Sequence, residues 1–170
     1  MLDLREITKQ IIEACKANEA LNTFINSNYS KPLTYVIGVD LERQEARNDY
    51  EDVPQICIDP IVEVFGDGEE KKEHHVGIRL MVQHPKEEVD LYLQKENGVI
   101  EYKGVLEVFD FYRLFYQAIK GYDKLNCFEI KEVESLSSVI EFQSNNTEYI
   151  GQVKMVFTND NEDHYIGCNS

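Results

Sequence analysis

Two carboxylates and a lysine form the pattern in this sequence that comes closest to a catalytic motif. Asp90 is followed by Glu101 and Lys103, which gives the spacing D-x10-E-x-K. Two carboxylates at such a spacing could hold one divalent cation across a hairpin, and the lysine could orient a water molecule for hydrolysis. The hypothesis is geometric, because it requires the three side chains to converge on a single ion.

The charge balance of the chain opposes this hypothesis. Restriction-type nucleases use the arrangement, but they also need a basic surface for DNA. Here 17 Lys and Arg stand against 32 Asp and Glu, a net charge of −15. An E-x-K triplet also recurs at Glu129 and Lys131, as expected in a chain rich in acids. We therefore expect no catalytic activity and no specific nucleic-acid binding, with a metal-dependent nuclease as the alternative.

Other residues that commonly bind metals or cofactors do not form a complete site. His74 and His75 are adjacent, and neighbours in a strand point to opposite faces. His164 and Cys168 supply two ligands where zinc needs three or four. The acidic stretch 40–52 lacks the sharp glycine turn of a calcium loop, and the chain has no glycine-rich phosphate loop. We expect no metal and no cofactor.

Length and composition indicate one globular domain. The chain has 170 residues, of which 42% are hydrophobic, enough to bury a core without disulfides. Its cysteines are widely spaced and form no CxxC pair, so we expect reduced and mostly buried thiols at 15, 57, 127 and 168. No apolar run reaches the ~18 residues of a membrane-spanning helix, and no signal peptide is evident at the first residues. We expect no association with a membrane.

Hydrophobic periodicity predicts an α+β order of elements. Apolar residues recur at helical spacing over 3–17, with Asp3 as the N-cap, and again over about 105–120, where we expect Phe109 and Phe115 to be buried. A short second helix lies between 18 and Pro32. Alternation predicts strands over about 35–41, 53–65, 76–82, 127–133, 139–142 and 149–158, with possible further strands at 89–93 and 99–102. Pro54 and Pro60 place the 53–65 strand at an edge or on a bulge.

These elements predict a single α+β domain over 1–158 with a polar, acidic tail over 159–170. The sheet should be mainly antiparallel, with the N-terminal helix and the long central helix packed on one face. The other face would carry Arg79, Met81, Lys131, Gln152 and Lys154, and would be solvated or meet another subunit.

The layout resembles the tail terminator, or tail-completion, proteins of long-tailed bacteriophages. The resemblance covers about residues 3–158. It rests on DYEDVPQICIDPIVEVFGDGEE, HHVGIRLMVQ, EYKGVLEVFDFYRLFYQAIKG and EYIGQVKMVFTND. It implies a structural protein without enzymatic activity that forms a ring, commonly a hexamer. The implied partners are the tail tube protein and the head-connector proteins. The implied location is the virion, with assembly in the host cytoplasm.

Charged residues then become candidates for subunit or partner contacts rather than for chemistry. The loops 42–52 and 66–75 are longer and more charged than simple connections need. In a head-to-tail ring, a cationic sheet face could meet the acidic loop of the next subunit, which predicts weak, salt-sensitive association. The candidate interface residues are Glu45, Arg47, Asp49, Asp67, Glu69, Lys71, Lys72, Arg79, Lys131 and Lys154.

Overall fold

Three α-helices and seven strands make up the part of the chain that the structure describes. The computed structural model describes residues 3–38, 54–65, 72–85, 93–96, 98–126, 128–142 and 146–159. In chain order the elements are α1 (Leu4–Ala17), α2 (Glu19–Asn28), β1 (Thr34–Ile37), β2 (Gln55–Phe65), β3 (Lys72–Pro85), β4 (Leu93–Glu96), β5 (Val99–Tyr102), α4 (Lys103–Lys120), the 3-10 turn η3 (Asp123–Leu125), β6 (Glu129–Phe142) and β7 (Asn146–Asn159).

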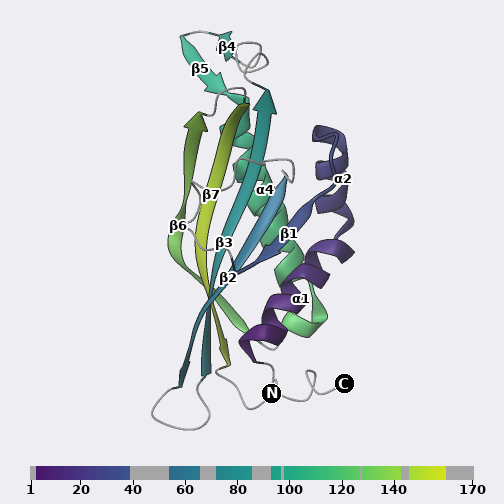
Figure 1. Cartoon of the computed structure of the whole chain (residues 1–170), viewed down its shortest axis with the longest axis vertical. Helices are drawn as coiled ribbons and strands as arrows, with labels where there is room; N and C mark the ends of the chain where they lie inside the picture. The colour runs from purple at the N-terminus through teal and green to yellow at the C-terminus, as the bar shows by residue number, and fades with distance from the viewer. Residues whose placement is uncertain are drawn as a thin grey trace.

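The main sheet is mixed but mostly antiparallel. It has five strands in the order β1-β2-β3-β7-β6, and only the β1–β2 pair is parallel. Strands β4 and β5 form a separate two-stranded ribbon at one end of the molecule (Figure 1). The predicted α+β domain with a mainly antiparallel sheet is confirmed.

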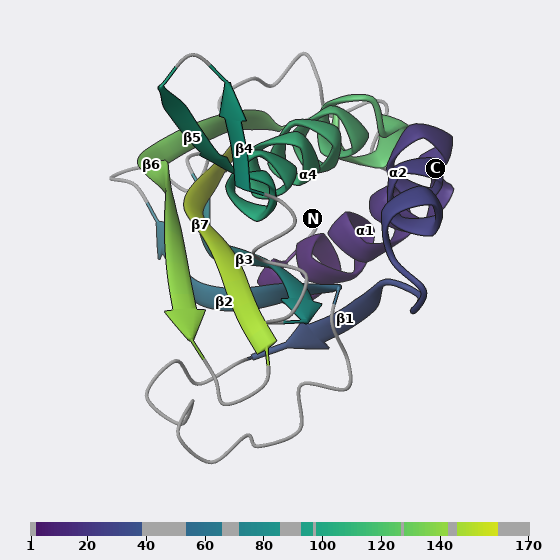
Figure 2. The ribbon, with the colours of Figure 1, turned by 90° about the horizontal axis from the view of Figure 1, so that it is seen from above.

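The α-helices lie on one face of the sheet, as predicted. In the view of Figure 2, α1, α2 and α4 lie on the same side of the curved strands. Helix α1 begins where expected, because the Asp3 side chain accepts a hydrogen bond from the Glu6 N–H at 2.8 Å. Asn18 ends α1 and also caps α2 through a 2.8 Å bond from the Leu21 N–H. A single residue therefore sets the corner between the two helices.

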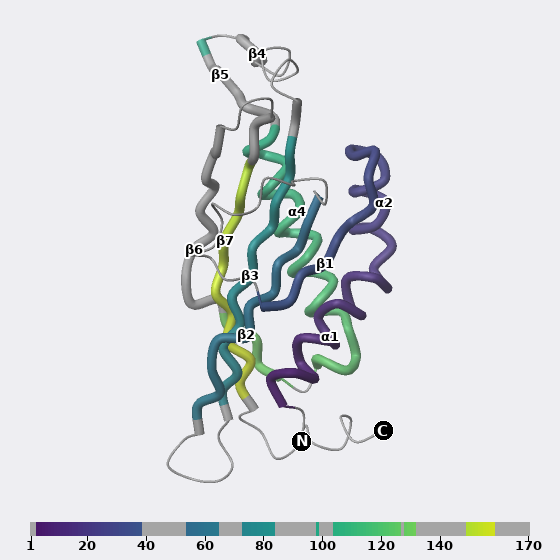
Figure 3. The backbone as a smooth tube through the Cα atoms, viewed as in Figure 1, coloured from purple at the N-terminus to yellow at the C-terminus, as the bar shows by residue number. Residues whose placement is uncertain are grey.

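The core lies between this helical layer and alternate residues of the sheet. In β3 these residues are His74, Val76, Ile78, Leu80 and Val82, all buried. The helices contribute Ile7, Ile11, Leu21, Phe111 and Phe115 to the same cluster, and the edge strand β6 contributes Ile130. We call this side of the sheet the inner face and the opposite side the outer face. Figure 3 shows the coloured parts of β2, β3 and β7 running side by side along the long axis of the molecule.

The predicted burial of Phe109 is wrong. Phe115 is fully buried, but Phe109 is 44% exposed, and so is its neighbour Leu106 at 47%. Helix α4 has apolar residues nearly all round, so their spacing did not determine which stripe packs against the sheet. The stripe that packs runs through Val108, Phe111 and Phe115, and it leaves Phe109 at the border.

Two irregularities in the ladders explain differences from the predicted strands. A bulge between Pro60 and Val62 lets β2 carry a proline although it lies inside the sheet, between β1 and β3. Strand β6 was expected as two segments but is continuous, and its register shifts between Glu132 and Ser137. Shifts of this kind interrupt the period of two that predicts a strand.

Candidate functional site

The residues of the nuclease hypothesis fall largely outside the described part of the chain. Asp90 lies outside it, as do the side chains of Glu101 at the end of β5 and Lys103 at the start of α4. Within the described residues, no group of three or more His, Cys, Asp or Glu side chains could hold a metal ion. The absence of catalytic activity therefore stays a prediction, and the convergence of Asp90, Glu101 and Lys103 stays the requirement of the nuclease alternative.

Most charged residues predicted for the interface also lie outside the described ranges. These are Glu45, Arg47, Asp49, Asp67, Glu69 and Lys71, together with the side chain of Lys72. Lys131 is exposed on β6, and its amino group lies 3.3 Å from the Glu129 carboxylate. Lys154 is half-buried on β7. Lys131 and Lys154 both lie on the outer face, as predicted.

Arg79 is not the exposed cation that the sequence suggested. It lies on the outer face of β3, but it is only 4% exposed in the isolated chain. Cys57, Met81 and Ile150 form a small buried cluster on the same face. The expectation that this whole face is solvated or meets a subunit is therefore wrong at Arg79 and Met81. Alternation in a strand gives the face of a side chain, but it does not reveal whether other parts of the chain cover that face.

The two adjacent histidines point to opposite faces, as predicted. His74 is buried on the inner face, with its Nδ1 3.2 Å from Oε1 of Glu63. The same carboxylate oxygen accepts a hydrogen bond from the N–H of Leu4, at the start of α1. His75 lies on the outer face, 3.0 Å from the Glu73 carboxylate. Glu63 thus joins the first turn of α1 to the strands beneath it. The positive end of the helix dipole favours the negative charge of this carboxylate.

A second buried carboxylate joins two helices. Glu107 of α4 is buried, and its Oε2 accepts a 2.8 Å hydrogen bond from the Tyr29 hydroxyl, just after α2. Burial, and then the neighbouring Glu107 carboxylate, raise the pKa of Tyr29 above its usual value. Tyr29 therefore remains a proton donor at neutral pH. The hydrogen bond between Tyr29 and Glu107 stabilises the fold, because it lies where α2 packs against α4.

Cys15 and Cys57 are free and buried, which confirms the predicted state of these two thiols. Cys127 and Cys168 lie outside the described residues. Burial raises the pKa of Cys15 to about 12. A thiol of this kind is a packing residue rather than a nucleophile.

We expect Cys15 to resist alkylation in the folded protein. With a pKa of about 12, only ~1 thiol in 10⁴ is ionised at pH 8, because each pH unit below the pKa lowers the thiolate fraction tenfold. Peptide mapping after iodoacetamide treatment should find Cys15 unmodified in native protein and modified in guanidinium chloride. Equal labelling rates in both states would contradict the burial.

Three exposed apolar side chains lie close together near the C-terminal end of β2. Ile61, Val62 and Val64 are 49%, 44% and 41% exposed, and we call them the arm patch. They flank Glu63, whose carboxylate binds the Leu4 N–H, so they lie beside the start of α1 on the part of β2 that leads to Phe65. Val62 pairs with His75 and Val64 with Glu73, so both valines are on the outer face.

The sequence predicted a strand over 53–65 that lies at an edge or carries a bulge, but it did not predict that Val62 and Val64 face outward. Up to Ile58 the even-numbered residues of β2 face the core, but the bulge at Pro60 inserts one residue and reverses the order. Glu63 then faces inward and the valines face outward. Pro60 indicated an edge or a bulge, and the charged Glu63 between two valines was the further signal that could have revealed this reversal.

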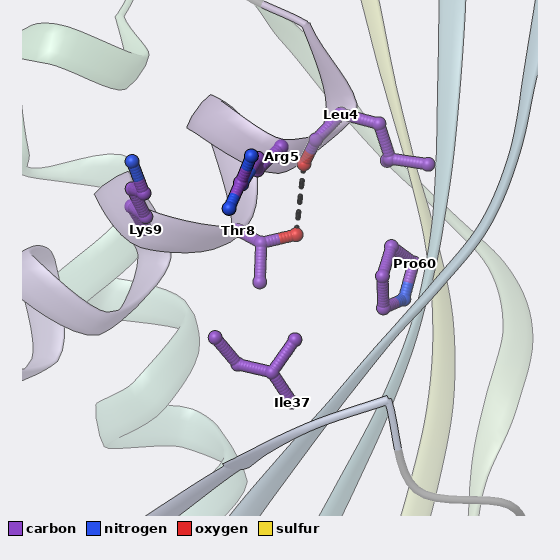
Figure 4. Close-up of a pocket in the computed structure, with 6 residues that line it drawn as sticks. All are labelled: Leu4, Arg5, Thr8, Lys9, Ile37 and Pro60. Atoms are coloured by element: carbon purple, nitrogen blue, oxygen red, sulfur yellow. Dashed lines mark hydrogen bonds between the residues drawn. The ribbon is translucent and has the colours of Figure 1, made fainter.

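A hollow of about 580 Å³ lies between the start of α1 and the strands (Figure 4). Its walls are formed by Leu4, Arg5, Thr8 and Lys9 of α1, Ile37 of β1 and Pro60 of β2. The Thr8 hydroxyl donates a 2.8 Å bond to the Leu4 carbonyl, so it is already satisfied within the helix. Two cationic side chains therefore border an otherwise mainly apolar hollow.

Neither a family model nor a curated protein sequence matches this chain. In the described residues, no helix is long and apolar enough to cross a membrane.

Proposed function

We propose that this chain is a structural protein that caps a phage tail tube as a homo-oligomeric ring and joins the tail to the head connector. The arm patch supports this proposal. Its apolar residues are β-branched side chains on a paired strand, so little conformational freedom remains to be lost when they are covered. Apolar residues exposed together in this way commonly mark a protein–protein contact.

A second exposed apolar surface lies far from the first. Leu106 and Phe109, which we call the α4 patch, belong to the first turns of α4. This end of α4 adjoins β5, at the opposite end of the molecule from the arm patch (Figure 1). Two separate patches suit a heterologous contact, in which the arm patch of one subunit covers the α4 patch of the next. Such contacts close into a ring when the rotation between subunits allows it.

The charge of the chain is compatible with this role. With a net charge of −15, an acidic ring would repel DNA and let it pass without binding. The apolar patches are small, and exposed charges on separate subunits repel one another. We therefore expect weak association in dilute solution, with the ring forming on the end of a tail tube.

Val62→Asp should weaken self-association at least about tenfold, because a carboxylate in the apolar contact would be desolvated without a partner. Native mass spectrometry and light scattering over a range of protein concentrations, with and without phage tail tubes, would measure this effect. Asn26→Asp is the matched control, since it adds the same charge at an exposed position of α2. It should assemble like the wild type.

Mixing two variants tests whether the contact is heterologous. Val62→Asp retains the α4 patch and Phe109→Asp retains the arm patch, so a mixture should form mixed dimers but no ring. Each variant alone should remain monomeric. Unchanged assembly of Val62→Asp, a tight two-fold dimer, or a monomer that never binds tail tubes would overturn the proposal.

A further inference from the structure

We infer that the hollow between α1 and the strands is the docking site for the chain's own C-terminal tail. The inference concerns the residues after Asn159 and does not depend on the proposed ring.

The hollow favours a ligand that is apolar and carries negative charge. Leu4, Pro60 and Ile37 supply apolar walls, and Ile37 is 52% exposed. Arg5 and Lys9 lie one helical turn apart on the α1 side. Within the described residues, Lys9 pairs with Glu6 at a loose 3.8 Å, and no carboxylate is paired with Arg5. The volume of about 580 Å³ lies within the range of ~300–1,000 Å³ that is typical of ligand pockets.

The tail combines the two properties that the hollow would bind. Its acidic residues are Asp160, Glu162 and Asp163, and its adjacent apolar residues are Tyr165 and Ile166. The apolar pair could enter the hollow while the acids lie beside the two cations. The docked tail would pair its acidic residues with Arg5 and Lys9, which are two of the 17 cationic residues in a chain of net charge −15.

The register of the sheet places the start of the tail close to the hollow. Phe157 of β7 pairs with His74, and His74 pairs with Glu63, whose carboxylate binds the Leu4 N–H. Two strand spacings, or ~10 Å, therefore separate the end of β7 from the strand beside Leu4. The segment from Asn159 to Tyr165 can extend ~20 Å at the rise of a strand. The tail of the same chain can reach the hollow without the help of a second subunit.

Disulfide trapping in the full-length chain tests this docking, because Cys168 lies two residues after Ile166. Ile37→Cys places a thiol at the exposed rim of the hollow. Under mild oxidation we expect a link between position 37 and Cys168 within one chain, identified by peptide mapping and by an unchanged molecular mass. Lys131→Cys is the matched control. Position 131 pairs with Val156 near the end of β7, so it lies close to the start of the tail. Its side chain is exposed on the outer face, away from the hollow.

Two further variants test the charge and the apolar contact separately. In the Ile37→Cys background, reversing Arg5 and Lys9 to Glu should lower the yield of the link about fivefold, because two charge pairs would become repulsive. Ile166→Ser should lower it by a similar factor without altering any described residue. Equal yields from positions 37 and 131, a yield insensitive to these changes, or a link between two chains would overturn the inference.

Discussion

Replacing Phe115 with alanine should lower the free energy of unfolding by ~3–5 kcal/mol, the usual cost of deleting a buried aromatic ring. Phe115 is fully buried in the core cluster, where α4 packs against β3 and β7. Its removal leaves a cavity that the surrounding side chains can fill only in part. Urea denaturation followed by circular dichroism would measure the change.

Phe109 provides the matched control, because it is the same residue type on the same helix. At 44% exposure its replacement by alanine should cost less than ~1 kcal/mol. Equal losses from the two substitutions would mean that α4 is rotated relative to the structure described. The comparison thus checks which stripe of this helix packs against the sheet.

Gly104→Ala should destabilise the protein by ~1–3 kcal/mol, the usual range for overpacking a core. A Cβ atom at position 104 would lie 2.4–2.6 Å from ring carbons of Tyr149, closer than van der Waals contact allows. Tyr149 is itself buried on β7, so its ring has little room to move. In an ordinary helix the same substitution would be stabilising, which makes the sign of the effect informative.

Gly77→Ala and a double variant serve as controls for this steric account. At Gly77 the nearest atoms would lie 3.5 Å or more from an added Cβ, so alanine should be tolerated. Tyr149→Leu removes the ring and should recover part of the loss caused by Gly104→Ala. A Gly104→Ala variant as stable as the wild type, or a double variant with strictly additive losses, would contradict a clash with Tyr149.

Features with a local signal could be predicted from the sequence. The start of α1 followed from Asp3 and the helical spacing after it, and the long helix followed from its apolar residues. Pro60 predicted that β2 lies at an edge or carries a bulge, since proline cannot donate to a ladder, and the structure has the bulge. In each case a few neighbouring residues contain the information.

Features that depend on distant parts of the chain could not be predicted in this way. The parallel pairing of β1 with β2 joins strands that no hairpin connects. The burial of Arg79 and the exposure of Phe109 depend on what covers each face, and periodicity is silent about that. The hollow at Leu4 combines residues from α1, β1 and β2, so it exists only once those elements have packed.

The position of β3 between β2 and β7 has a consequence for the growing chain. Strand β2 can pair with β3 once both have left the ribosome, but the other edge of β3 pairs with β7, the last strand described. Until β7 is made, the long β3 strand presents an open edge to other nascent chains, a recognised route to aggregation. Closing that edge also requires contacts between distant segments, which slows folding. The surplus of acidic residues would oppose such aggregation by mutual repulsion during synthesis.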